Sequence, residues 1–359
     1  MTNDLNQDQR MHRICNTLKE EGYIVTLVGR KKPNSNPLYP QAFDQHRFNM
    51  FCHDGILFYL EYHIRLFIYL LFSNSPDLLF SVDLDTALPV SLVSFLRRSK
   101  SIHDAHELFT EVPELQSSPV KRCIWNWVGK RTMKSFDHRF TVNDSLVKIL
   151  TEKYDCKFTC VRNFPFIKKA SKSKLEVVEP YIWYQGVLNE GRGLEQMIEA
   201  MTLLPDLHLR IAGEGDRSLT LRIQAENSAA ANRIHFHGWM NAEGMHNWAS
   251  NAWIGINLLD HEAGSYYHSL ANRTFDFVQA ALPTIHMDFP EYRSIVKQYG
   301  IGVLLSRLES KSIVKTIEKL EGSTIQYDII KKACIKYKSQ LTWENESKKL
   351  SEVLRDLIK

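Results

Sequence analysis

The sequence lacks the features that mark secreted, zinc-binding and membrane-embedded chains. Its six cysteines include no C-x-x-C pair and follow no secretory signal, so we expect free thiols and no zinc site. The apolar stretch 56–72 contains Glu61, His63 and Arg65 and is too short and too charged to span a bilayer. We expect a buried helix there, with contact to a membrane interface as the alternative. The net charge of +4 excludes nucleic-acid binding that rests on charge alone.

Two further absences bear on the fold. No G-x-G-x-x-G follows the first predicted strand, residues 23–28, which argues against an NAD dehydrogenase. No strand precedes the first predicted helix, residues 8–20, although an α/β domain normally begins with one. We therefore expect that the first central strand of the N-terminal domain is missing, through a truncation or a misassigned start.

The length and the order of predicted elements indicate two α/β domains. A chain of 359 residues is long enough for two domains. Strands and helices alternate along both halves, a pattern typical of parallel sheets. A segment rich in Lys and Ser separates the halves and reads as a linker. The predicted divisions are an N-terminal domain 1–165, a linker 166–178, a C-terminal domain 179–340 and a C-terminal helix 341–359.

The segment 268–287 combines groups that suit a phosphate with a group that suits a diol. It reads as a polar loop, a helix of about three turns that stops at Leu282-Pro283, and a short apolar strand. Backbone N–H groups and the positive end of the helix dipole favour an anion near Arg273, which adds a formal charge. Asp276, one turn further on, can accept hydrogen bonds from hydroxyl groups. Together these residues predict a nucleotide-sugar site.

The same segment resembles the donor-binding helix of the retaining glycosyltransferases of the GT-B fold, family 4 type (glycosyl transferases group 1). Their pattern runs S-L-P-N-K-x-F-E-Y-x-A-A-G-L-P-V-I. Arg273 stands at the Lys position, Asn272 at the Asn, and Asp276 at the second Glu of the paired E-x7-E motif. The first Glu falls at His268, so the pair is incomplete. Glu262 is an alternative for that first Glu, although its spacing to Asp276 differs.

Other landmarks of the family follow in its usual order. The run 102–114 resembles the Y-D-S-H-E-x-F-T-E-V-P-E run of a glycosyltransferase subgroup. This resemblance implies that His106 hydrogen-bonds the transferred sugar or the acceptor, while Asp104 orients it or acts as an acceptor-side base. The loop 186–193 resembles the G-x-x-x-x-x-K-G segment, with Arg192 at the phosphate-binding Lys.

The resemblance implies the GT-B fold, with two Rossmann-like doubly wound domains facing a cleft and a C-terminal helix that crosses back to the N-terminal domain. It also implies transfer of a sugar from a nucleotide-diphosphate sugar to a glycan or lipid-linked acceptor, with retention and with neither metal nor cofactor. Two alternatives stay open, a nucleotide-sugar epimerase on the same fold and a non-catalytic nucleotide-sugar-binding homologue. We expect polysaccharide or glycoconjugate synthesis in the cytoplasm, including the inner face of the membrane, where basic clusters would meet anionic lipid.

The candidate site residues form three groups. Catalytic roles are expected for His106, Asp104, Arg192 and Arg273. Donor binding is expected for Gly186, Gly191, Gly193, Gly213, Gly215, His268, Ser269, Leu270, Asn272 and Asp276. The acceptor side is expected to include Asp4, Arg10, Asp83, Asp85 and Glu107.

Overall fold

The chain folds into two compact units in the computed structural model. The structure describes all residues except 7, 34, 75, 112–114, 116–117, 169–178, 262–263 and 359. The first unit comprises Met1–Asn163 together with Glu346–Lys359, and the second comprises Phe164–Asn345. The division after Asn163 lies two residues before the predicted domain boundary, and most of the predicted linker lies outside the described residues.

The first unit contains two parallel sheets and begins with a helix, as the sequence predicts. Strands β1 (Thr26–Lys31) and β2 (Asp44–Asn49) pair with each other. A separate sheet has the order β3-β4-β5-β6. Its strands are β3 (Leu78–Val82), β4 (Lys100–Ala105), β5 (His138–Thr141) and β6 (Thr159–Cys160).

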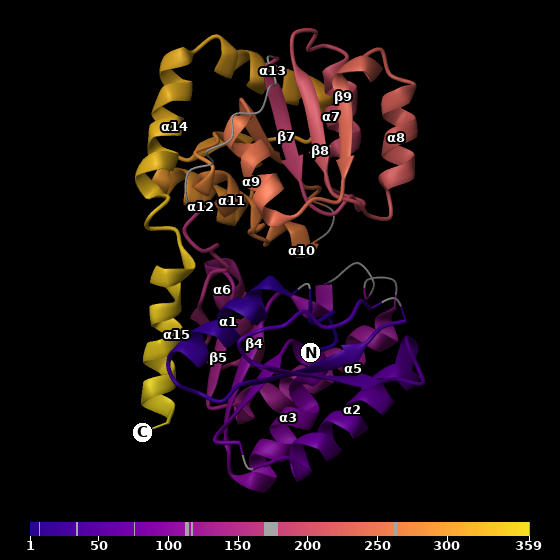
Figure 1. Cartoon of the computed structure of the whole chain (residues 1–359), viewed down its shortest axis with the longest axis vertical. Helices are drawn as coiled ribbons and strands as arrows, with labels where there is room; N and C mark the ends of the chain where they lie inside the picture. Colours follow the sequence, from indigo (N-terminus) through magenta and orange to yellow (C-terminus); the bar gives the residue numbers. More distant parts are fainter. Residues whose placement is uncertain are drawn as a thin grey trace. The chain divides into compact units, whose positions relative to one another are not determined.

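Helices pack around these sheets (Figure 1). They are α1 (Gln9–Glu20), α2 (Gly55–Phe72), α3 (Leu84–Arg97), α5 (Pro119–Thr132), α6 (Asp144–Tyr154) and the later part of α15 (Trp343–Leu357). Short 3-10 turns cover Phe109–Glu111 and Met133–Ser135. In α15, Leu350 and Leu354 are fully buried, so this helix has an apolar side.

The second unit is built on a parallel sheet of six strands in the order β12-β11-β10-β7-β8-β9. The strands are β7 (Tyr181–Gln185), β8 (His208–Ala212), β9 (Ile234–Gly238), β10 (Ile254–Asn257), β11 (Thr284–Met287) and β12 (Gly302–Leu305). Strand β10 lies inside the sheet, and β9 lies at one edge. Every residue of β7 and β10 is buried, because helices cover both faces of the sheet.

Alternating side chains of β7 divide the core of the second unit between those two faces. Tyr181 and Trp183 pack with Phe277, whereas Ile182 and Tyr184 belong to the larger cluster on the other face. The surrounding helices are α7 (Leu194–Met201), α8 (Ser218–Glu226), α9 (Ala242–Asn251), α10 (Gly264–Tyr267), α11 (Arg273–Gln279), α12 (Pro290–Tyr299), α13 (Ser310–Glu321) and α14 (Thr324–Tyr337), with a 3-10 turn at Ala231–Arg233.

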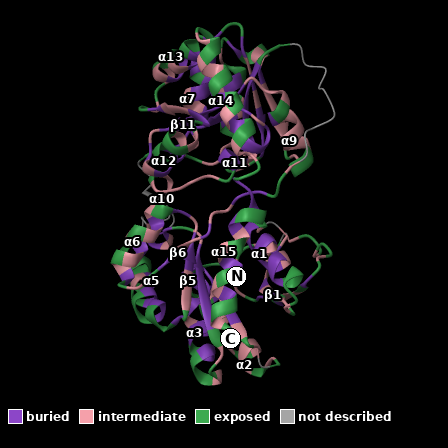
Figure 2. Ribbon diagram, turned by 90° about the vertical axis from the view of Figure 1, so that its left-hand side faces the viewer, coloured by how far each residue is buried: buried purple, intermediate pink, exposed green. Residues whose placement is uncertain are grey.

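Two expectations from the sequence need correction. The helix α11 has seven residues, about two turns rather than three. It ends early because Ala281 adopts a left-handed conformation with φ of 55°, and Leu282 N then donates to Phe277 O across the end of the helix. The helix α2 is buried along one face only. Figure 2 shows exposed residues along α2. Burial in a core therefore does not explain why this helix is apolar on its other face.

Candidate functional site

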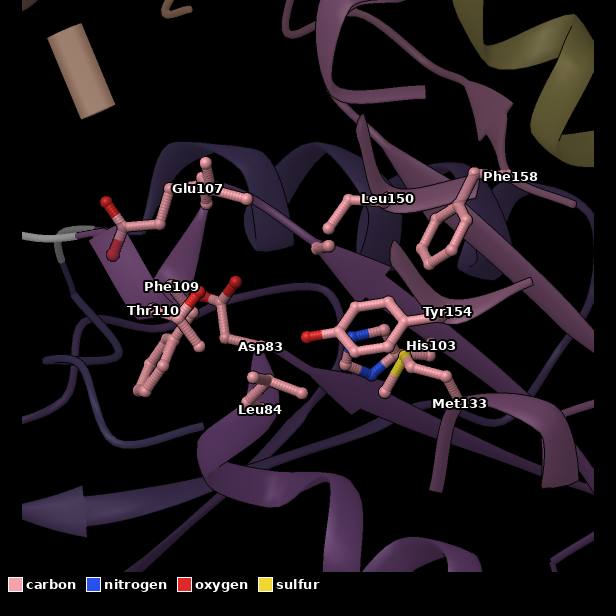
Figure 3. A pocket seen from close by; sticks show the side chains of 12 residues that line it. Asp83, Leu84, His103, Glu107, Phe109, Thr110, Met133, Leu150, Tyr154 and Phe158 are labelled. Atoms are coloured by element: carbon pink, nitrogen blue, oxygen red, sulfur yellow. The ribbon is translucent and has the colours of Figure 1, made fainter. Parts of the chain in front are cut away.

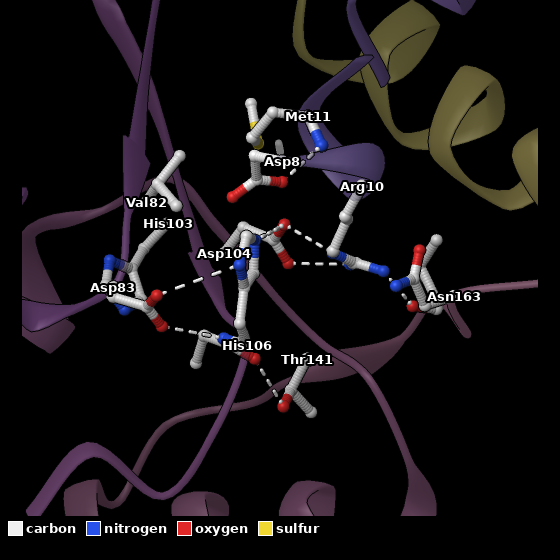
Figure 4. Close-up of polar contacts among 12 residues, drawn as sticks. Asp8, Arg10, Met11, Val82, Asp83, His103, Asp104, His106, Thr141 and Asn163 are labelled. Atoms are coloured by element: carbon white, nitrogen blue, oxygen red, sulfur yellow. Dashed lines mark hydrogen bonds and ion pairs between the residues drawn. The ribbon is translucent and has the colours of Figure 1, made fainter. Parts of the chain in front are cut away.

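A cluster of charged side chains lies at the carboxyl ends of β3 and β4 in the first unit. Val82 pairs with Asp104 in the register of the two strands, so the residues after each strand emerge next to each other. Asp83 directly follows β3, and His106 directly follows β4. Arg10 reaches the same place from α1 (Figure 4).

Asp104 is the centre of this cluster. Its carboxylate accepts two hydrogen bonds from Arg10, at 2.8 Å from Nε and 2.7 Å from Nη2, and it has no exposed surface. The Oδ2 atom of Asp104 also lies 2.9 Å from Nε2 of His106. Arg10 is itself fixed by a bond of 2.7 Å from Nη1 to the carbonyl oxygen of Val161. Both carboxylate oxygens are therefore engaged, and these contacts suit the orienting role for Asp104 better than the role of a base.

The ring of His106 lies between two carboxylates. Besides the contact to Asp104, its Nδ1 atom is 3.7 Å from Oδ2 of Asp83, and its backbone N–H donates to Oδ1 of Asp83 at 2.8 Å. The side chain of His106 keeps 16% of its surface exposed, so a ligand can reach it. Asp83 adopts a φ of 55°, a conformation that L-residues rarely adopt and that is concentrated at functional sites.

The carboxylates decide the charge of His106. Burial alone would lower the pKa of His106, but Asp83 and Asp104 raise it to about 9. Burial raises the pKa of Asp83 to about 8. The pKa of Asp104 lies below its usual range, because Arg10 and His106 outweigh the effect of burial. At neutral pH the contact with the ionised carboxylate of Asp104 therefore favours the imidazolium form of His106, a hydrogen-bond donor with a positive charge rather than a base.

The other predicted acceptor-side residues are placed differently. Glu107 lines a cavity of about 10 Å³ together with Asp83, a space for about one water molecule (Figure 3). Asp85 lies near the cluster and accepts a hydrogen bond from the hydroxyl of Thr2. The contacts of Asp4 do not connect it to the cluster. Its carboxylate accepts hydrogen bonds from the backbone N–H of Asn6 and from the hydroxyl of Ser35.

The second unit brings Arg192 and Arg273 together. Arg273 is 7% exposed, its Nη1 atom donates to the carbonyl oxygen of Gln185 at 3.1 Å, and its guanidinium lies 4.5 Å from the centre of the Tyr184 ring. Arg192 lies over the Tyr266 ring at 4.7 Å, and its Nε is buried without a hydrogen-bond partner. Burial and the charge of Arg273 lower the pKa of Arg192. Among the described residues, neither arginine has an ion-pair partner.

Glycines let the backbone approach these arginines closely. A Cβ atom at Gly186 would lie 3.4 Å from Nη1 of Arg273, and its φ is 138°. Gly213, with φ of 130°, packs directly against the carbonyl oxygen of Gly186. Gly191 and Gly193 also have positive φ. The loops after β7 and β8 thus meet at the carboxyl edge of the sheet, with Gly215 beside the first of them.

Asp276 projects from α11 into the same part of the second unit. Its Oδ1 atom lies 3.0 Å from Nζ of Lys168, and its Oδ2 atom accepts from Nε2 of Gln185 at 3.4 Å. The side chain remains 24% exposed. Gln185 thus touches both Asp276 and Arg273. Neither Lys168 nor Gln185 is recognisable as a site residue from the sequence, because Lys168 belongs to the predicted linker and Gln185 ends a buried strand.

The polar loop before α11 has mostly internal contacts. The hydroxyl of Ser269 donates to Tyr266 O at 2.8 Å, and Leu270 packs against the core. Asn272 precedes the helix without forming a side-chain cap, and the ring of His268 lies 5.0 Å from that of Tyr267. Glu262, the alternative for the first Glu of the paired motif, lies outside the described residues.

No metal centre is found in the described part of the chain. No group of three or more His, Cys, Asp or Glu side chains is placed there to hold an ion. Function without a metal stays a prediction, and the two arginines are the groups that would carry the positive charge in the second unit.

Comparison with known families decides what kind of domain the second unit is. Residues 166–338 match the family model described as glycosyl transferases group 1. Most of the second unit therefore matches a glycosyltransferase family model. The match covers the strands and helices that carry Arg192, Arg273 and Asp276. Comparison with curated protein sequences gives no match.

Solved structures extend the likeness to the whole chain. Sucrose-phosphate synthase from Thermosynechococcus elongatus aligns over 96% of this chain and 92% of its own, with a TM-score of 0.77 and 16% identity. HepE from Anabaena, solved with UDP and glucose, aligns over 99% and 98%, with a TM-score of 0.77 and 13% identity. A protein described as a UDP-N-acetylglucosamine 2-epimerase from Listeria monocytogenes aligns over 93% and 89%, with a TM-score of 0.63 and 14% identity. The chain therefore has the GT-B fold, as predicted.

Proposed function

We propose that this glycosyltransferase moves a sugar from a nucleoside-diphosphate sugar to a glycan or lipid-linked acceptor, with retention of configuration. The observation that carries the proposal is the pair formed by Arg192 and Arg273. Two neighbouring guanidinium groups that are largely buried and lack a carboxylate partner among the described residues are costly unless an anion joins them. A diphosphate has the charge and the oxygen atoms to satisfy both.

The second unit would hold the donor. The diphosphate would lie against Arg192 and Arg273, where the glycines of the neighbouring loops let backbone groups come close. Asp276 would accept hydrogen bonds from the ribose hydroxyls. Its present contact with Lys168 must then open, and such a partly exposed ion pair costs little to break. UDP binding by HepE supports a nucleoside diphosphate as the ligand type, without fixing the base for this chain.

The first unit would supply the acceptor-side groups. We assign to His106 the role of a charged hydrogen-bond donor toward the transferred sugar or the acceptor, held by Asp104 and Asp83. Arg10 is a positioning residue that acts through Asp104. Because His106 is already protonated, it is not the group that removes the acceptor proton.

The proposed chemistry is a same-face substitution at the anomeric carbon. The bond between this carbon and the diphosphate oxygen breaks, and the acceptor oxygen forms the new bond on the face that the leaving group departs from. The acceptor proton passes to the departing diphosphate oxygen, which serves as the base. Arg192 and Arg273 stabilise the negative charge that grows on the diphosphate as the bond breaks. The main rival, an epimerase, needs a base that takes a proton from the sugar ring, and in this proposal Asp276 is instead occupied by the ribose hydroxyls.

Nucleotide binding by matched arginine variants tests the proposal. We expect that Arg192→Met and Arg273→Met each weaken binding of the nucleoside diphosphate that the parent protein binds best, measured by calorimetry, by roughly tenfold to a hundredfold, since a hydrogen bond to a charged group contributes about 1.5–3 kcal/mol. Arg210→Met is the control. Arg210 also lies over aromatic rings in the second unit, at 5.3 Å from the centre of the Tyr181 ring and 5.1 Å from that of Trp248. Neither ring belongs to a predicted donor-binding residue. Equal losses in all three variants would contradict the proposal.

A further inference from the structure

The helix α2 is the most unusual surface element of the first unit. Among the described residues it is the one helix that is long and apolar enough to cross a membrane. Yet one of its faces belongs to the folded unit, where Phe58, Tyr62 and Leu66 pack with Phe48 and Met50 around the β1–β2 sheet. A helix with a packed face of this kind lies on its domain, so its outward apolar face needs a separate explanation.

The outward face of α2 is a continuous apolar stripe. Leu60, Ile64, Ile68 and Phe72 follow one another at four-residue spacing, which places them along one side of the helix. Their exposed fractions are 56%, 51%, 50% and 78%. Single exposed apolar residues are ordinary on a protein surface, whereas contiguous apolar surface of this extent marks a contact with a partner or a membrane.

Two helices that contact α2 also expose apolar residues. Arg97 at the end of α3 donates to Ser73 O at the end of α2 at 2.8 Å, which ties the two helix ends together. Trp125 of α5 packs edge-on against Tyr59 of α2 at 4.9 Å. We call the combined surface the α2–α3–α5 face. Its exposed apolar residues are Ile56, Leu57, Leu60, Ile64, Ile68 and Phe72 on α2, Leu92, Phe95 and Leu96 on α3, and Val120, Ile124 and Trp127 on α5.

Positive charge accompanies these apolar residues. Helix α5 carries four basic residues and no acidic one. Arg97 and Arg98 stand at the end of α3 beside Phe95 and Leu96, and Lys100 follows but pairs with an aspartate. The acidic side chains on the three helices are Glu61, whose carboxylate is bound by Arg65 and by backbone N–H groups, and Asp85, which is buried. The α2–α3–α5 face therefore combines apolar side chains with an excess of cations.

We propose that the α2–α3–α5 face binds the surface of an anionic lipid bilayer, with α2 lying parallel to the membrane plane. Aliphatic and aromatic side chains flanked by Lys and Arg are the combination that binds at the boundary of anionic headgroups and acyl chains. A second copy of the chain fits less well, because both copies would bring the same excess of cations into a symmetric interface. The inference goes beyond the proposed transfer reaction and does not depend on it.

Vesicle co-sedimentation of the full chain tests the inference without any enzyme assay. We expect binding to vesicles of phosphatidylcholine with phosphatidylglycerol, little binding to phosphatidylcholine alone, and weaker binding at high salt. The double variant Leu60→Glu with Ile64→Glu should weaken binding by at least about tenfold, because it places charges where apolar side chains enter the membrane. Lys121→Ser with Arg122→Ser on α5 should weaken it by about tenfold or more.

A matched control separates the proposed face from exposed apolar surface in general. Ile325→Glu with Ile329→Glu changes two isoleucines on α14 of the second unit that are 75% and 61% exposed, and it should leave vesicle binding unchanged. Unchanged thermal midpoints of all variants will show that folding is intact. Absence of binding to anionic vesicles, or equal binding by the parent protein and the α2 variant, would overturn the inference. Light scattering that shows a dimer dissociated by the α2 variant would also overturn it, and would assign the face to self-association.

Discussion

The charge of His106 gives a prediction that can be worked out from the structure in some detail. The neighbouring carboxylates raise the pKa of His106 from its ordinary value of 6.5 to about 9. A base with a higher pKa in the folded protein contributes stability that is fully present below pH 6.5 and is lost as the pH rises through 9. At about 1.4 kcal/mol for each pKa unit, the whole contribution is about 3 kcal/mol, and about 2 kcal/mol of it is lost between pH 6.5 and 8.

In the variant His106→Gln, the free energy of unfolding should therefore depend less on pH between pH 6.5 and 8 than it does in the parent protein. We expect that the free energy of unfolding, measured with urea at intervals from pH 6.5 to 8, falls with pH more steeply in the parent protein than in His106→Gln, by about 2 kcal/mol over the window. The pKa of Asp83, raised to about 8 by burial, also responds to His106, so the difference between the two proteins contains the titration of both groups. His261→Gln, at a histidine whose side chain is 73% exposed, should behave like the parent.

Equal slopes for the parent protein and His106→Gln would refute this reasoning. Such a result would mean that His106 is neutral in the folded protein, and its role as a charged donor would then fail. Activity offers an independent reading of the same charge. A neutral histidine acting as a base would give a transfer rate that rises through pH 6.5, whereas the imidazolium gives a rate that does not.

Two further predictions concern the second unit. Lys168→Ala should raise the affinity for a nucleoside diphosphate, measured by calorimetry, by up to about fivefold. The reason is that Asp276 would no longer have to break its ion pair with Lys168, which is worth at most about 1 kcal/mol, before it binds the ribose. Lower affinity would show that Lys168 itself holds the ligand. Gly213→Ala should lower the free energy of unfolding by at least about 2 kcal/mol, since its Cβ atom would overlap Gly186 O at a φ of 130°. The control Gly300→Ala, with φ of 67° and an ordinary contact of 3.8 Å to Ala333, should cost only about 1 kcal/mol.

The sequence predicts the fold well because hydrophobic pattern and element order are both local and repeated. The apolar run 253–258 is typical of a central parallel strand and contains β10, and the short segment 234–237 lies in the edge strand β9. The length of α11 could not be predicted, because it ends where Ala281 adopts a positive φ, and alanine carries no signal for that conformation. The division between buried and exposed faces was also missed in α2, where both faces are apolar and composition cannot tell them apart.

The candidate site was predictable only where residue type implies chemistry. Arg192 and Arg273 stand out as cations at family positions, and the structure places them together. Gln185 and Lys168 give no such signal, because their roles depend on the neighbours that the sheet brings to Asp276. The double contact of Asp104 with Arg10 joins residues 94 positions apart, and no local pattern in one sequence reports a pair at that separation.

The measurement that tests the central claim most directly is a calorimetric titration of the full chain with UDP, GDP, ADP and CDP in the presence of EDTA. We expect that one of these nucleotides binds in the absence of metal and that Arg192→Met and Arg273→Met lose most of this affinity while Arg210→Met retains it. A ligand at about 100 times its dissociation constant would also stabilise the chain by about 2.7 kcal/mol. Binding that requires a divalent ion, or no binding of any of the four nucleotides, would contradict the account.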